Sequence, residues 1–161
     1  MNSSPAILDE KYNEVLLAIN RNEMAANVVL LIGKHGTGKT QVLSRLASNN
    51  GYQLFNVGQS LSKSLLSYSK EERPTQVEAL LDEACSSKAV LLLDNTEILF
   101  HPDLKQNVMR LLKTIGRKRK YPIVVSIAGS IQHGSLLYSA SPFTDSKKYD
   151  IHEFLSVCMG D

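Results

Sequence analysis

The chain has 161 residues, a length that predicts one domain with little room for a second. Its composition, with 43% hydrophobic and 21% charged residues, is typical of a globular domain and excludes disordered and fibrous proteins. The formal net charge of +2 shows no overall bias toward nucleic acid or membranes. No apolar run approaches the roughly 20 residues that span a bilayer, and the first residues lack the pattern of a secretory signal. We therefore expect a cytoplasmic protein that makes no membrane contact.

Helical and strand spacings of the apolar residues alternate along the chain. Helical spacing predicts helices within residues 8–19, 42–47, 75–84 and 104–115. Short apolar runs predict strands at residues 28–32, 53–57, 89–93 and 122–128, with one more within 149–154. Thr75 and Glu78 form a capping-box pattern at the start of the third helix, and the Ser- and Gly-rich residues 129–148 are predicted to form a loop. Strands that alternate with helices predict parallel pairing through right-handed crossovers.

A P-loop motif, G-x-x-x-x-G-K-[ST], spans Gly33 to Thr40, between the strand at 28–32 and the next helix. Its glycines let backbone N–H groups wrap a phosphate chain, and the helix N-terminus adds its positive dipole end. We expect Lys39 to contact the β- and γ-phosphates of ATP and the Thr40 hydroxyl to bind Mg²⁺. The predicted nucleotide-binding residues are Gly33, Lys34, His35, Gly36, Thr37, Gly38, Lys39, Thr40 and Gln41.

The sequence therefore predicts an α/β fold: a P-loop three-layer sandwich with a mostly parallel sheet of about five strands and no lid domain. We expect an N-terminal helix within residues 1–22 to pack on a core domain formed by residues 23–161.

Further candidates for the site lie at the ends of the other apolar strands. Asp94 directly follows four apolar residues, where a carboxylate would complete the Mg²⁺ site. The next residue is Asn95, which can orient a water molecule but cannot take its proton. Glu97 is a candidate for that role, or else an ordinary solvated residue. Ser126 and Ser130 are candidate γ-phosphate sensors on the adjacent strand.

The small net charge conceals two halves of opposite sign. Residues 104–144 contain seven basic residues and no acidic ones, whereas residues 1–103 carry 9 basic and 12 acidic residues. The densest part is the block Arg117, Lys118, Arg119 and Lys120. Such a block within the stretch 105–120 can contact DNA phosphates, dock an acidic partner or place an arginine in a neighbouring nucleotide site, or simply stay solvated at a helix C-terminus.

The P-loop, the strand that ends in Asp94-Asn95 and the absence of an Asn-Lys-x-Asp guanine motif resemble ATP-binding domains of the AAA+ class. From about residue 25 to 130, the chain is similar to the small BrxF proteins of type III bacteriophage-exclusion (BREX) defence systems. This similarity is carried by Gly33–Thr40, by Asn56-Val57-Gly58 followed by Leu61 and Leu65-Leu66, and by Leu93–Phe100.

The BrxF resemblance implies a nucleotide-binding subunit that acts beside larger DNA-modifying, helicase or ATPase components. The chain departs from full AAA+ ATPases because it has no room for a helical lid and no Arg after Ser130. We therefore expect slow or partner-stimulated hydrolysis of Mg·ATP. A nucleotide-dependent switch without turnover and a small nucleotide kinase are the alternatives, and a homo-oligomer stays open.

Overall fold

The computed structural model describes residues 4–21, 26–139 and 147–160. Its helices are α1 (Pro5–Ile19), α2 (Lys39–Asn50), α3 (Val57–Leu65), α4 (Arg73–Ala84) and α5 (Val108–Arg117), with the 3₁₀ helices η1 (Glu97–Phe100) and η2 (Pro102–Leu104). Its strands are β1 (Val28–Gly33), β2 (Gln53–Asn56), β3 (Leu91–Asp94), β4 (Ile123–Gln132), β5 (Ser135–Tyr138), β6 (Lys147–Asp150) and β7 (Leu155–Cys158).

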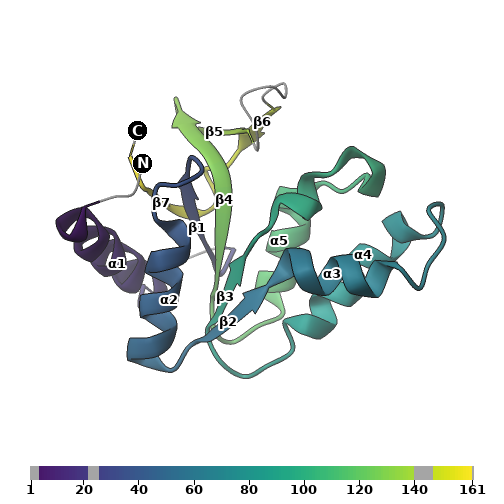
Figure 1. Ribbon diagram of the computed structural model, residues 1–161, viewed down its shortest axis with the longest axis horizontal. Coiled ribbons are helices and arrows are strands. Elements are labelled where there is room, and N and C mark those ends of the chain that lie inside the picture. The colour runs from purple at the N-terminus through teal and green to yellow at the C-terminus, as the bar shows by residue number, and fades with distance from the viewer. Residues whose placement is uncertain (1–3, 22–25, 140–146, 161) are drawn as a thin grey trace.

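The main sheet has the strand order β2-β3-β4-β1-β7, and each of these neighbouring pairs is parallel. Helices α1 and α2 cover one face, and α3, α4 and α5 cover the other (Figure 1). The predicted three-layer α/β fold with about five mostly parallel strands is confirmed.

Strand β1 lies between β4 and β7 in this sheet and is buried along its whole length. Val29 and Leu31 pack into the cluster under α1 and α2, whereas Val28, Leu30 and Ile32 pack into the cluster on the other face. A strand buried on both faces needs apolar residues at every position, which is why its sequence reads as an unbroken run rather than an alternating one.

Helix α3 was not predicted, because its nine residues place only Val57, Leu61 and Leu65 in the core. Asn56 ends β2 and caps α3 through a hydrogen bond from the Gln59 amide, so the predicted strand at 53–57 is one residue too long. The predicted Thr75–Glu78 capping box is also wrong. The reciprocal pair is Ser69 and Glu72, six residues earlier, where each side chain accepts a hydrogen bond from the other's backbone amide.

The predicted loop at 129–148 is wrong for its described residues, because β4 continues into an antiparallel hairpin with β5, and β5 pairs with β6. The hairpin turns at His133 and Gly134, both with positive φ (50° and 76°), as a two-residue turn of the favoured twist requires. Residues 140–146 of that predicted loop lie outside the described residues. The strand predicted within 149–154 ends at Asp150, and the fifth parallel strand is β7, further along the chain.

Candidate functional site

The P-loop joins β1 to α2 at the carboxyl edge of the sheet. Gly36 and Gly38 have positive φ (81° and 101°), a backbone region that side chains with a Cβ rarely adopt. A Cβ at Gly33 would lie 2.5 Å from the Thr37 hydroxyl, and one at Gly38 would lie 2.7 Å from a methyl of Leu8. The backbone conformation of the loop and its close packing against neighbouring side chains therefore both favour the glycines of the motif.

The Lys39 ammonium lies inside this loop. Its Nζ donates hydrogen bonds to the carbonyl oxygens of Gly33 (2.6 Å) and Lys34 (3.0 Å). Burial lowers the pKa of Lys39, while the Glu97 and Asp94 carboxylates oppose this shift by favouring the ammonium form. A positive charge is therefore held among the backbone groups that would wrap a phosphate chain.

Asp94 connects the P-loop to β4. Its Oδ2 accepts a hydrogen bond from the Thr40 hydroxyl (2.8 Å), and its Oδ1 accepts one from the Ser126 hydroxyl (2.7 Å). The side chain is only 9% exposed, so both carboxylate oxygens are oriented by these two hydroxyls. Three elements that are distant in the sequence, α2, β3 and β4, meet at this carboxylate.

The turn that follows β3 presents two more polar side chains. Asn95 has a positive φ of 54°, and a Cβ at Gly58 would lie 3.0 Å from the Asn95 carbonyl oxygen, so α3 packs closely under this turn. Glu97 opens η1 and acts electrostatically on both Lys39 and Tyr138, since burial and this carboxylate together raise the pKa of Tyr138 to about 12.

These groups surround one cavity of about 320 Å³. Its lining residues are His35, Gly36, Gly38, Lys39, Thr40, Gln41, Asp94, Asn95, Glu97 and Ser126. The structure thus brings together most of the predicted nucleotide-binding residues with the candidates for the reaction itself, which are Lys39, Asp94, Asn95 and Glu97. Gly33, Lys34 and Thr37 shape the loop through backbone carbonyls and the Thr37–Lys34 hydrogen bond without lining the cavity.

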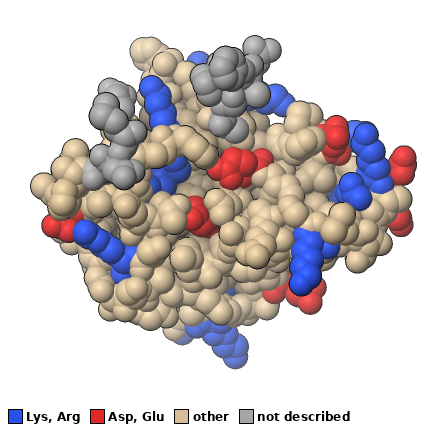
Figure 2. Space-filling model, in the orientation of Figure 1, with Lys and Arg blue, Asp and Glu red and all other residues tan. Residues whose placement is uncertain are grey.

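Two sets of predicted residues do not reach the cavity. Ser130 lies in the hairpin part of β4, paired with Leu137, and is not among the lining residues. The basic block at 117–120 begins at the last residue of α5, at the side of the sheet opposite the P-loop. Figure 2 shows acidic and basic side chains interspersed on one face of the molecule.

Sequence reasoning missed Thr96 as a positioning residue. Its hydroxyl donates a hydrogen bond to the Ser126 carbonyl oxygen, and the side chain is only 2% exposed. The turn carrying Asn95 and Glu97 is thereby tied to β4. Threonine is common in turns, so the residue type by itself did not indicate this role. The contact depends on the fold, which places Thr96 beside β4.

The donor set fits a magnesium ion. Mg²⁺ prefers oxygen ligands and is usually held by one or two protein groups together with phosphates and water. The Thr40 hydroxyl and the Asp94 carboxylate, 2.8 Å apart in the cavity, provide such oxygens. The described residues contain no cluster of three or more His, Cys, Asp or Glu side chains that would bind a metal ion by itself.

Comparison with known proteins gives a family match. The family model of the AAA proteins, "ATPase family associated with various cellular activities", matches residues 29–136, more than half of the chain. No curated protein matches the chain. Within the described residues, no helix is long and apolar enough to cross a membrane.

Eight chains of solved structures match. One is the C. elegans protein PCH-2, with 18% identity and a TM-score of 0.40 over 80% of this chain. The match covers only 37% of that PCH-2 chain. The family match over residues 29–136 includes the P-loop, Asp94 and Ser126, and the chain therefore belongs to the AAA family of P-loop ATPases.

Proposed function

We propose that this protein binds Mg·ATP in the P-loop cavity and hydrolyses it slowly, or when a partner stimulates it. The observation that carries this proposal is the pair of hydrogen bonds from Thr40 and Ser126 to Asp94, beside the Lys39 ammonium. Together they place one cation, one carboxylate and two hydroxyls around a cavity large enough for a phosphate chain.

Each side chain has a distinct role in this proposal. Lys39 exchanges its two carbonyl partners for phosphate oxygens and neutralises their charge. Thr40 and Asp94 hold the magnesium ion, which supplies charge neutralisation at the phosphates. Ser126 orients Asp94 from the adjacent strand.

Glu97 is the proposed general base that takes a proton from the attacking water. Its carboxylate lines the cavity and acts on the Lys39 ammonium, so it lies within the electrostatic range of the phosphate site. Asn95 can hold the same water by a hydrogen bond but cannot accept its proton. Turnover is expected to be slow, because the residue directly after Asp94 is the amide Asn95 and the base, Glu97, lies three residues beyond Asp94.

Binding and turnover are tested separately. Calorimetry should show that Lys39→Ala loses ATP affinity, whereas Lys34→Ala, in the same loop, retains it. Phosphate release should fall to background in Asp94→Asn and Glu97→Gln. Unchanged ATP affinity in Lys39→Ala contradicts the nucleotide site itself.

A nucleotide-dependent switch without turnover is the second candidate, and the exposed Asn95 amide beside Asp94 favours it. Normal ATP affinity together with wild-type turnover no higher than that of Asp94→Asn, with and without partners, would establish the switch. The small-kinase alternative lacks support, because no arginine-rich segment that could clamp an acceptor follows the fourth predicted strand.

We further propose that the protein acts in the cytoplasm as a subunit of a BREX-type defence complex. Support comes from the resemblance carried by Gly33–Thr40 and Leu93–Phe100. Purification with the products of the neighbouring genes tests this proposal. Recovery of none of them, in the presence of ATP and of DNA, would contradict it.

A further inference from the structure

The helices α4 and α5 end, and the strands β3 and β4 begin, at the side of the sheet away from the P-loop (Figure 1). Residues from this region line a second depression. Its volume is about 560 Å³, larger than that of the nucleotide cavity. Lys88, Lys118, Arg119, Lys120, Asp82 and Tyr121 are among its lining residues. Because parallel strands run from this edge toward the P-loop, the two sites lie at opposite ends of the same strands.

Arg119 forms part of the wall with its guanidinium turned inward. It donates hydrogen bonds to the backbone carbonyls of Cys85, Ser87, Ala89 and Tyr121, which fixes the α4–β3 connection. Burial lowers the pKa of Arg119. Carbonyl groups are neutral, and none of the ion pairs among the described residues includes Arg119, so its positive charge is not cancelled by a carboxylate.

Of the three lysines around the depression, Lys118 is the one that forms an ion pair among the described residues. Lys118 lies 3.6 Å from Asp82, and both side chains are about half exposed. The Nζ of Lys120 lies 5.6 Å from the centre of the Tyr121 ring. Lys88 is exposed on the connection between α4 and β3. Four cations against one carboxylate leave three positive charges in excess within a single concave site. At physiological salt such charges act together, since the screening length is about 8 Å.

Hydroxyl groups add hydrogen-bonding capacity to the same wall. Ser86 is exposed, and the Ser87 hydroxyl is buried without a hydrogen-bond partner among the described residues. Because the Ser87 oxygen is buried, Ser86 is the hydroxyl of this pair that a bound group can reach. Lysine, arginine and serine side chains are the groups that proteins use most to hold phosphate oxygens.

We propose that this depression binds the phosphate backbone of double-stranded nucleic acid, without reading its sequence. A protein partner is disfavoured because the lining has no exposed aliphatic side chain, and interface cores rely on apolar anchors. A single strand is disfavoured because Tyr121 is the one aromatic residue of the lining, whereas stacking platforms need several.

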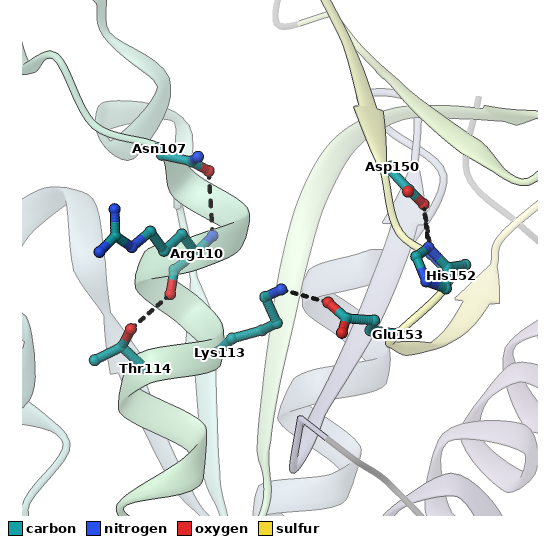
Figure 3. A network of polar contacts seen from close by, with 7 residues as sticks. All are labelled: Asn107, Arg110, Lys113, Thr114, Asp150, His152 and Glu153. Atoms are coloured by element: carbon teal, nitrogen blue, oxygen red, sulfur yellow. Dashed lines mark hydrogen bonds and ion pairs between the residues drawn. The ribbon is translucent and has the colours of Figure 1, made fainter.

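The site differs from the basic stretch 105–120 that the sequence predicts. Lys113 is engaged with Glu153 after β6 (Figure 3), and Arg119 holds the backbone together instead of facing solvent. Lys88, which is 30 residues away from Lys118 in the sequence, joins the site through the fold. The contact surface is therefore a concave site, built mainly from the α4–β3 and α5–β4 connections, and not the face of one helix.

The test uses fluorescence anisotropy with a labelled DNA duplex of about 25 base pairs, at salt concentrations from 50 to 200 mM. The double variant Lys88→Glu/Lys120→Glu removes two exposed cations and leaves Arg119 and the fold intact. The control Lys63→Glu/Lys148→Glu makes the same charge change at exposed positions on α3 and β6. Calorimetry with ATP confirms that both variants keep the nucleotide site.

We expect the depression variant to lose at least about tenfold in duplex affinity at low salt, with the slope of log affinity against log salt reduced by about two. The control should stay within about twofold of the wild type. Equal losses in both variants, or no loss in the depression variant, would falsify the site. Displacement of the duplex by an acidic peptide at equal charge concentration would overturn the choice of nucleic acid in favour of a protein partner.

Discussion

The ring of Phe100 stacks on the ring of Tyr138, with centroids 3.9 Å apart and planes inclined by 10°. Tyr149 on β6 meets Phe100 edge-on at 5.6 Å. Phe100 is the last residue of η1, and Glu97 is the first, so the hairpin holds the short helix that presents Glu97 to the cavity. Aromatic pairs of this kind contribute about 0.5–1.5 kcal/mol beyond their buried area.

Loss of this stack should affect turnover more than nucleotide affinity. We expect Tyr138→Leu to lower the rate of phosphate release roughly tenfold, because a displaced Glu97 no longer meets the attacking water. ATP affinity by calorimetry should change less than about twofold, since the P-loop contacts are untouched. Tyr138→Phe keeps the stack and should keep the rate. An equal loss in Tyr138→Phe would assign the effect to the hydroxyl instead.

Ser126→Ala should weaken the magnesium-dependent part of ATP affinity by about tenfold to a hundredfold, because Asp94 loses the hydroxyl that orients its Oδ1. Calorimetry with ATP, in the presence of Mg²⁺ and of a chelator, measures this part. Ser130→Ala is the matched control, a hydroxyl on the same strand that does not line the cavity. A larger effect at Ser130 than at Ser126 would contradict this assignment.

Gly116→Ala should destabilise the protein although alanine favours helices. A Cβ at Gly116 would lie 2.4 Å from the Ala26 carbonyl oxygen and 2.7 Å from a methyl of Val28, so α5 would have to move off β1. Overpacking of this kind costs about 1–3 kcal/mol, against about 1 kcal/mol gained in helix propensity. Urea unfolding measures the difference, and the exposed neighbour Arg117→Ala should stay within about 0.5 kcal/mol of the wild type. A stability increase in Gly116→Ala would show that α5 and β1 are not in this contact.

His152 should titrate above its ordinary pKa of 6.5, because its Nδ1 lies 2.6 Å from Asp150, whose carboxylate stabilises the imidazolium (Figure 3). The same pair lowers the pKa of Asp150. The stability contributed by His152 is complete below pH 6.5 and is lost as the pH rises through the raised pKa of the folded state. NMR titration of the imidazole should show the raised pKa, and Asp150→Asn should return it toward 6.5. Identical titration in both proteins would exclude the pair in solution.

Much of the site could be predicted from local sequence. Gly33 to Thr40 follows a buried strand and opens a helix, and this context requires the loop whatever the rest of the chain does. Asp94 was predictable for a related reason, since an acid directly after an apolar strand lies at the carboxyl edge of a parallel sheet. The hairpin of β4 and β5 was missed because Gly129, Ser130, Gly134 and Ser135 interrupt its apolar residues. Its signal was the two-residue turn at His133 and Gly134.

The sequence by itself determined the strand–loop–helix at the nucleotide site, because backbone shape and short spacings are local properties. Only the tertiary structure decided which distant groups meet. It brings Thr40, Asp94 and Ser126 together across three elements, and it stacks Phe100 on Tyr138. It also divides the basic stretch, turning Arg119 inward and adding Lys88 to the depression. Such outcomes depend on strand order and helix packing, in which each contact joins residues that are dozens of positions apart.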